Sequence, residues 1–145
     1  MARTGSSNSP RIVKSVETTC EILYAIMDSD GATVTELARD LDRSKASVYN
    51  HLTTLKQQEL VRKDGNTYRL SLRFLELGEN AKKRLSVPDV AKRELDKLAE
   101  DTDTRTQLVV EENGDAVYLY QATEDDDVGA PVGVGERFPA PISVG

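Results

Sequence analysis

The pattern of apolar residues is clearest between residues 33 and 70, where it predicts two short helices. The first helix has one apolar face with the i, i+3, i+4, i+7 spacing of Val34, Leu37, Ala38 and Leu41. The second follows Ser44, a good N-cap, and repeats a helical spacing at Val48, Leu52 and Leu55. Asp42 lies between them and tolerates the left-handed backbone of a sharp turn. The pattern therefore predicts a helix-turn-helix.

Two short segments with the composition of strands follow the second helix. They are Leu60–Lys63 and Thr67–Leu70, and Asp64-Gly65-Asn66 separates them. Asp-Gly is a strong hairpin signal, and Arg62, Lys63 and Arg69 lie on or near the predicted tip. Helix, turn, helix and basic hairpin in this order predict a winged helix-turn-helix over residues 11–70.

The second helix carries the candidate chemistry. If its apolar residues point inward, a rotation of about 100° per residue places Ala46, Asn50, Thr53 and Gln57 on the far side, with Ser47 and Thr54 beside them. A small, neutral, polar surface of this kind fits a major groove, where the Asn50 amide can pair with adenine. We predict a recognition helix whose DNA contacts are Lys45, Ala46, Ser47, Tyr49, Asn50 and Thr54.

A second set of residues is predicted to contact DNA phosphates and hold the register. Lys45 and Tyr49 belong to it, together with Arg43, Arg62, Lys63, Asn66 and Arg69 on the turn and the wing. The other interpretation is a solvated helix face beside an ordinary surface hairpin. DNA binding is favoured because helix face, wing and charge agree with one another.

Charge divides the 145-residue chain in two. Residues 1–85 contain 14 Lys and Arg against 11 Asp and Glu, whereas residues 86–145 contain 5 against 14. A mildly basic module therefore precedes a strongly acidic one, and the local charge matters more for nucleic acid than the whole-chain net charge of −6. The abundance of acids also suggests an organism with a salty cytoplasm.

Flanking segments complete the organisation. Residues 1–10 are small and polar and predict a disordered arm. A helix from Lys14 to Met27 is predicted to bury Val16, Cys20, Leu23 and Met27, with Ile22 and Ile26 broadening the stripe. A linker helix should occupy residues 71–86, with Gly78 as a close-packing point or a bend, and Ser86-Val87-Pro88 should end the module.

Residues 87–145 read as a second region of α+β type. A helix from Pro88 to Asp101 precedes a hairpin centred on Asn113-Gly114. Its apolar face should consist of Val109, Val117 and Leu119 with Leu95 and Leu98. A candidate strand lies around Val132–Val134. The four acids from Glu124 to Asp127 lack the spacing of a calcium loop, so we expect no metal there and no cofactor.

Other classes of function find little support in the residues. The only histidine, His51, lies in the predicted recognition helix, where packing or a phosphate contact is favoured over general-base chemistry. No nucleophile elbow or dinucleotide fingerprint is present, so we expect no enzyme. A protein-docking winged helix remains the competing interpretation. With one cysteine and no long apolar span, the sequence predicts a cytoplasmic protein.

The run from Val16 to Leu85 resembles the DNA-binding half of the isocitrate lyase regulator (IclR) family of transcription factors. The matching pieces are VTELARDLDRSKASVYNHLTTLKQQELV, the wing VRKDGNTYRL and the following LRFLELG. The acidic bias resembles the haloarchaeal members. The resemblance implies an oligomer that binds operator DNA through paired winged helices, and a C-terminal effector domain related to small-molecule sensor (GAF-like) folds.

The resemblance continues past the module and then stops. QLVVEENGDAVYLYQA resembles the first hairpin of the effector domain, and VGERFPAPISVG resembles the segment ahead of its ligand pocket. The remaining family strands have no counterpart, so we expect a truncated effector domain that binds no small effector tightly and is less protected than residues 12–85. The family often has Arg at the position of Asn50 and an apolar residue at that of His51, so the operator sequence does not transfer.

Overall fold

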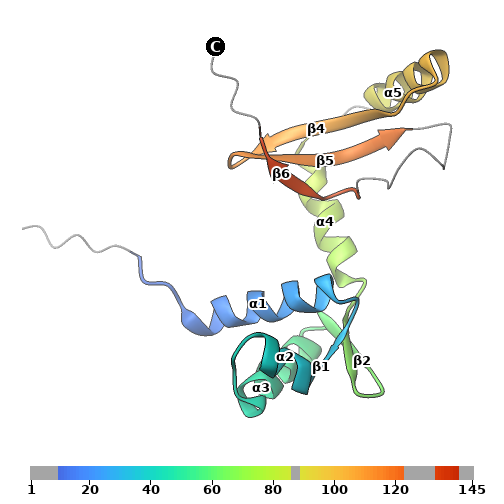
Figure 1. Cartoon of the computed structure of the whole chain (residues 1–145). Coiled ribbons are helices and arrows are strands. Elements are labelled where there is room, and N and C mark those ends of the chain that lie inside the picture. Colours follow the sequence, from blue (N-terminus) through green and yellow to red (C-terminus); the bar gives the residue numbers. More distant parts are fainter. Residues whose placement is uncertain (1–9, 86–88, 123–132, 141–145) are drawn as a thin grey trace, which may run out of the picture. The chain divides into compact units, whose positions relative to one another are not determined.

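The computed structural model describes residues 10–85, 89–122 and 133–140, and the chain divides into two compact units, Met1–Gly78 and Glu79–Gly145. Each combines helices with a small antiparallel sheet (Figure 1), which confirms the predicted α+β class. The division falls inside α4 (Arg73–Lys83), whereas the sequence places the boundary at residues 86–88, outside the described ranges. The predicted arm lies outside them too, except for Pro10.

The helices of the first unit begin and end where local signals place them. They are α1 (Lys14–Asp28), α2 (Val34–Asp40) and α3 (Lys45–Gln57). Thr33 caps α2 by a reciprocal pair of hydrogen bonds with Glu36, and the Ser44 hydroxyl caps α3 by accepting from Ser47 N at 3.1 Å. Asp42 has φ of 50°, the left-handed conformation predicted for the turn. The helix-turn-helix is confirmed.

The wing is a three-stranded sheet in the order β1-β3-β2. Strands β2 (Val61–Asp64) and β3 (Thr67–Leu70) form the predicted hairpin, and β1 (Ala32–Thr33), which the sequence did not reveal, pairs with β3. Asp64 pairs with Thr67, so the loop consists of Gly65 and Asn66 alone. Gly65 takes φ of 58° there, a conformation that favours glycine.

The core of the first unit lies between the three helices and the sheet. Its buried residues are Ile22, Ile26, Ala32, Leu37, Ala38, Val48, Leu52, Leu55, Val61 and Tyr68. The prediction for α1 was wrong for Val16, Cys20 and Met27, which are exposed. It was right for Ile22 and Ile26, which are buried, and for Leu23, which is partly buried against the core. The helix is apolar on more than one side, and the spacing did not separate its inner apolar residues from its outer ones.

The second unit contains α5 (Asp89–Thr102) and a sheet in the order β4-β5-β6. Strands β4 (Thr106–Glu112) and β5 (Asp115–Ala122) form the predicted hairpin, with Asn113 and Gly114 both at positive φ. The third strand is β6 (Arg137–Pro139); Val134, placed in a strand by the sequence, lies in the turn before it. The Phe138 ring meets the Tyr118 ring edge to face, with centroids 5.5 Å apart.

The interior of this unit is small. Among its described residues only Ala99, Thr106, Leu119 and Ala122 are buried, and the Thr106 hydroxyl donates to the Leu95 carbonyl at 2.9 Å. Leu98 and Val109, predicted for the apolar face, are exposed. One cause is a register shift, because Leu108 pairs with Tyr120 but Val109 pairs with Tyr118. Leu119 is then an extra residue in β5 and interrupts the alternation of faces.

Two further expectations concern single features. A Cβ at Gly78 would meet nothing within 4 Å, so the glycine is no close-packing point, and α4 continues through it. The acidic run at residues 124–127 lies outside the described ranges. Within those ranges no cluster of His, Cys, Asp and Glu could hold a metal ion, and no helix is long and apolar enough to cross a membrane.

Candidate nucleic-acid interface

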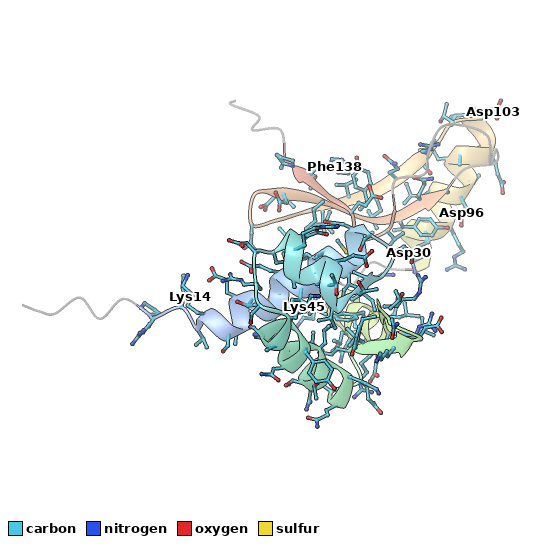
Figure 2. The ribbon with its side chains drawn as sticks, turned by 60° about the horizontal axis from the view of Figure 1, so that its bottom comes forward. Lys14, Asp30, Lys45, Asp96, Asp103 and Phe138 are labelled. Atoms are coloured by element: carbon cyan, nitrogen blue, oxygen red, sulfur yellow. The ribbon has the colours of Figure 1, made fainter. Side chains whose placement is uncertain are left out.

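Helix α3 separates its apolar and polar residues cleanly. Val48 and Leu52 are 0% exposed and Leu55 is buried beside them. The opposite side of the helix, which we name the outer face, consists of Lys45, Ala46, Tyr49, Asn50, Thr53, Thr54 and Gln57, all exposed. Lys45 lies at the first turn of the helix (Figure 2), and Ser47 is half-buried where its backbone meets the Ser44 cap. The outer face is thus held rigidly by a fully packed inner face.

Hydroxyl groups on the outer face are partly engaged by the helix itself. The Thr53 hydroxyl donates to the Tyr49 carbonyl at 2.8 Å, and the Thr54 hydroxyl donates to the Asn50 carbonyl at 3.1 Å. The Asn50 amide has no side-chain hydrogen bond among the described residues. It therefore keeps both its donor and its acceptor for a ligand, as bidentate recognition of a base requires.

The cations near α3 fall into two groups. Lys45, Arg62 and Lys63 form no ion pair within the described residues, and Lys63 Nζ lies 5.6 Å from the centroid of the Tyr68 ring. Arg43 instead pairs with Glu21 at 3.2 Å, and Arg69 pairs with Asp30 at 3.1 Å. Asn66 is exposed in the loop of the wing.

Sequence reasoning did not foresee the contribution of α1. A groove of about 290 Å³ lies between α1 and α3, lined by Ser15, Val16, Thr19, Asn50, His51 and Thr54. Thr19 Oγ1 lies 2.8 Å from His51 Nδ1, and His51 is half-buried. The sequence does contain a weak signal for this groove: Ser15 and Thr19 are four residues apart, so they share one side of the helix.

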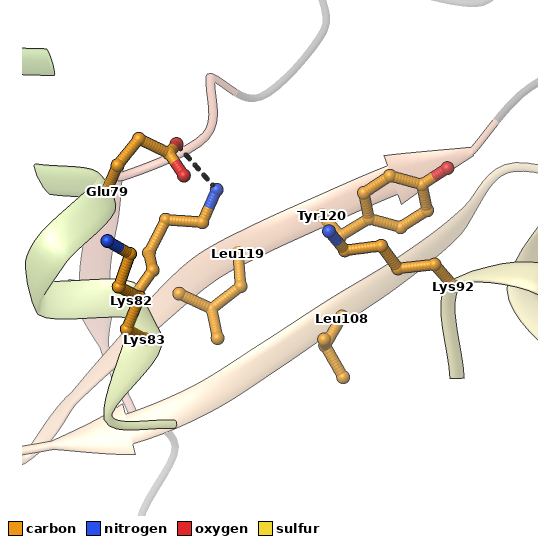
Figure 3. Close-up of a pocket in the computed structure, with 7 residues that line it drawn as sticks. All are labelled: Glu79, Lys82, Lys83, Lys92, Leu108, Leu119 and Tyr120. Carbon is orange, nitrogen blue, oxygen red and sulfur yellow. Dashed lines mark hydrogen bonds and ion pairs between the residues drawn. The ribbon is translucent and has the colours of Figure 1, made fainter. Parts of the chain in front are cut away.

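The second unit contains a separate depression of about 200 Å³ (Figure 3). Its lining consists of Glu79, Lys82, Lys83, Lys92, Leu108, Leu119 and Tyr120. Lys82 pairs with Glu79 at 3.1 Å, and Lys92 Nζ lies 5.8 Å from the centroid of the Tyr120 ring. The volume is below the range of about 300–1,000 Å³ that is usual for small-molecule pockets.

The fold and the exposed face of α3 define a class: a winged helix-turn-helix protein with the geometry that binds duplex DNA. Residues 17–63 match the family described as "Bacterial regulatory protein, arsR family". Over 124 residues the chain is 32% identical to the Halobacterium salinarum "Probable HTH-type transcriptional regulator ArcR", covering 85% of this chain and 47% of that protein. It is 25% identical to the Bacillus subtilis "HTH-type transcriptional regulator KipR", covering 87% of this chain and 51% of that protein.

Solved structures agree with these relatives. An IclR transcriptional regulator from Alicyclobacillus acidocaldarius superposes with a TM-score of 0.64 at 27% identity, covering 89% of this chain and 54% of that chain. An IclR homolog from Microbacterium hydrocarbonoxydans, solved with 4-hydroxybenzoate, gives a TM-score of 0.71 at 17% identity over 86% and 53% of the two chains, a likeness of fold alone.

In sequence and fold the chain is therefore similar to transcriptional regulators, IclR-type regulators among them. The chain spans about half the length of the regulators that it matches. The relatives from Halobacterium salinarum and Bacillus subtilis are both described as HTH-type transcriptional regulators.

Proposed function

We propose that this chain recognises a specific operator sequence in duplex DNA and regulates transcription there, with α3 in the major groove and the β2–β3 wing along the backbone. The proposal is carried by the outer face of α3. Apart from Ala46 and Tyr49 this face is polar, and all of it is exposed, while Val48, Leu52 and Leu55 on the inner face are buried. A rigid helix with such a face can approach base edges without steric conflict.

The role proposed for each side chain follows from the hydrogen-bonding groups and charges that it does not use within the described part of the chain. Asn50 reads a base through its unengaged amide, and Ser47 lies one turn nearer the start of α3. Lys45, Arg62 and Lys63, which form no ion pair within the described residues, contact phosphates. Arg43 and Arg69 are held by acidic partners, but a guanidinium has five N–H donors and can contact a phosphate while keeping its partner.

We further propose that the chain binds DNA as a dimer through α1. One recognition helix reads only a few base pairs, so a paired site is needed for useful specificity. Cys20, Tyr24 and Met27 are exposed along one side of α1, with Val13 exposed at its N-cap, and Tyr24 is 65% exposed. Large apolar side chains aligned on one face favour burial against a second copy.

The test is to compare base and phosphate contacts by substitution. Asn50→Ala should weaken binding to the preferred operator by about 1–3 kcal/mol and relax preference at one base pair. Lys63→Ala should weaken binding to all DNA sequences about equally. It should also lower the salt slope, the dependence of log affinity on log salt concentration, by about one unit. Binding is measured by fluorescence anisotropy on sites recovered from sheared genomic DNA over a range of salt concentrations.

Gln58→Ala supplies the matched control, because Gln58 is an exposed residue at the C-cap of α3 and does not belong to the outer face. It should leave both affinity and salt slope nearly unchanged. If the intact chain recovers no preferred DNA and shows no salt-dependent binding to any duplex, the competing function, a docking module for another protein, takes precedence.

A further inference from the structure

The groove between α1 and α3 opens on the same surface as the outer face of α3. Asn50 and Thr54 belong both to the outer face and to the groove, while α1 contributes Ser15, Val16 and Thr19. A ligand held against the outer face would therefore reach the groove, whose volume of about 290 Å³ accommodates a phosphate group with ease.

Hydrogen bonds at Thr19 fix the tautomer of His51. Thr19 Oγ1 lies 2.8 Å from the Ser15 carbonyl oxygen and 2.8 Å from His51 Nδ1. A carbonyl oxygen only accepts, so the single hydroxyl hydrogen is directed to Ser15. His51 Nδ1 must then carry a hydrogen and donate it to Thr19. In the neutral ring, Nε2 is left with a lone pair and with no hydrogen-bond partner among the described residues.

The lining of the groove contains no carboxylate that would repel an anion. His51 is the one titratable group in its lining. On α1 the charged groups are Lys14 with Glu17 (2.8 Å), Glu21 with Arg43 of the turn (3.2 Å), and Asp28 at the far end of the helix. On α2 they are Glu36 and the pair of Arg39 with Asp40 (2.7 Å), and on α3 they are Lys45 and Lys56. Helix α3 carries no acid, and both carboxylates of α1 nearest the groove are in ion pairs with cations.

We propose that this groove holds a backbone phosphate of the bound duplex and that His51 takes up one proton from solvent at Nε2 as the phosphate enters. The new Nε2–H donates to a phosphate oxygen, while Nδ1–H continues to donate to Thr19, so the ring does not rotate. The Ser15 hydroxyl and the Asn50 amide supply neutral donors beside it. The inference rests on the proposed DNA-binding function and adds to it a proton-linked contact from His51 on α3, whose ring is oriented by Thr19 on α1.

Proton uptake makes DNA affinity depend on pH. Binding that requires a protonated ring strengthens as pH falls, by at most about tenfold per pH unit for one proton. Because the chain has a single histidine, the difference between the parent and a His51 variant isolates this contribution between pH 6 and 8. The contact is to a phosphate, so a mixed-sequence duplex of about 30 base pairs, three helical turns, serves as the probe.

The experiment measures affinity for this duplex from pH 6 to 8 at constant ionic strength, for the intact chain and for His51→Gln. The parent should bind at least about threefold more tightly at pH 6 than at pH 8, and its salt slope should be larger by about one unit at pH 6. His51→Gln should bind equally at both pH values. Thr19→Val, which removes the acceptor that orients the ring, should reduce the pH dependence without adding or removing a titratable group.

A second measurement needs no DNA. The nitrogen-15 shifts of the single imidazole at pH 8 should report the Nδ1–H tautomer in the free chain, and Thr19→Val should move the population toward Nε2–H. Failure of the parent to bind the duplex at any pH would overturn the proposed function. Binding that is independent of pH, or that strengthens as pH rises, or an Nε2–H tautomer in the free chain, would overturn only the phosphate inference.

Discussion

The two units of the chain use similar lengths of sequence with different results. The first gathers ten buried residues from three helices and a sheet into one core, whereas the described part of the second buries four residues behind a hairpin and one helix. The first can therefore hold an exposed polar helix face in a fixed position. The difference indicates that the outer face of α3 is supported by a packed core, while the described part of the second unit relies more on its hydrogen-bonded hairpin.

Core truncation is the strongest test of this difference. Leu52→Ala removes a side chain that is 0% exposed and should lower the free energy of unfolding of the first unit by about 2–5 kcal/mol. Leu119→Ala is the matched change in the second unit. It should cost about 2 kcal/mol or less, because Leu119 lines an open depression and the site can relax. Calorimetry of the intact chain measures both.

The result that would contradict the comparison is a single transition that both substitutions shift equally. It would mean that the units unfold as one cooperative body, with each core supporting the other. Two transitions, each moved by its own substitution, would sharpen the comparison into separate stabilities for the two units.

The two units are also contrasted by the roles proposed for their exposed apolar residues, on α1 in the first unit and on α5 in the second. Tyr24→Asp, on the exposed side of α1, should raise the dissociation constant of the dimer by at least about tenfold, about 1.4 kcal/mol, because a carboxylate would be buried against the partner. Leu98→Asp changes an exposed residue of α5 and should leave the dimer intact. Sedimentation equilibrium over a range of concentrations measures the dissociation constant for the parent and both variants. A chain that stays monomeric at high concentration has no α1 dimer to lose.

Residues within the first unit explain why so much of it could be predicted. Ser44 and Asp42 mark the ends of helices by local chemistry, and Val48, Leu52 and Leu55 define one apolar stripe on α3. Their burial and the turn conformation are as predicted. The roles of individual residues in DNA binding stay predictions.

Prediction from the sequence failed where two apolar stripes competed on one helix, or where the pairing of two strands was irregular. Helix α1 has two apolar stripes, and spacing alone cannot tell the one through Cys20 from the one through Ile22 and Ile26. In the second unit, the extra residue Leu119 breaks the alternation that had grouped Val109 with it. The groove at His51 depends on contacts between residues 32 positions apart, which no local pattern contains.

The smallest predicted effect is a difference in the pH response of the two units. In the first, the Thr33 backbone N–H and hydroxyl both donate to Glu36 at 2.8 Å and lower the pKa of that carboxyl from its ordinary 4.5. In the second, the Tyr120 hydroxyl donates to Asp96 at 2.6 Å, which stabilises the neutral phenol and raises the pKa of Tyr120 from its ordinary 10.0.

The signs of the two contributions are opposite. A lowered pKa means that Glu36 stabilises the first unit above about pH 4.5 and that this stabilisation is lost as pH falls through the folded-state pKa. A raised pKa means that Tyr120 stabilises the second unit below about pH 10 and that this stabilisation is lost as pH rises through the folded-state pKa. Melting temperatures of the parent, Glu36→Gln and Tyr120→Phe from pH 3 to 11 measure both. The difference in melting temperature between the parent and Glu36→Gln should disappear at acid pH. The difference between the parent and Tyr120→Phe should disappear at alkaline pH. Gaps that stay constant with pH would mean that neither hydrogen bond depends on the charge of its titrating group.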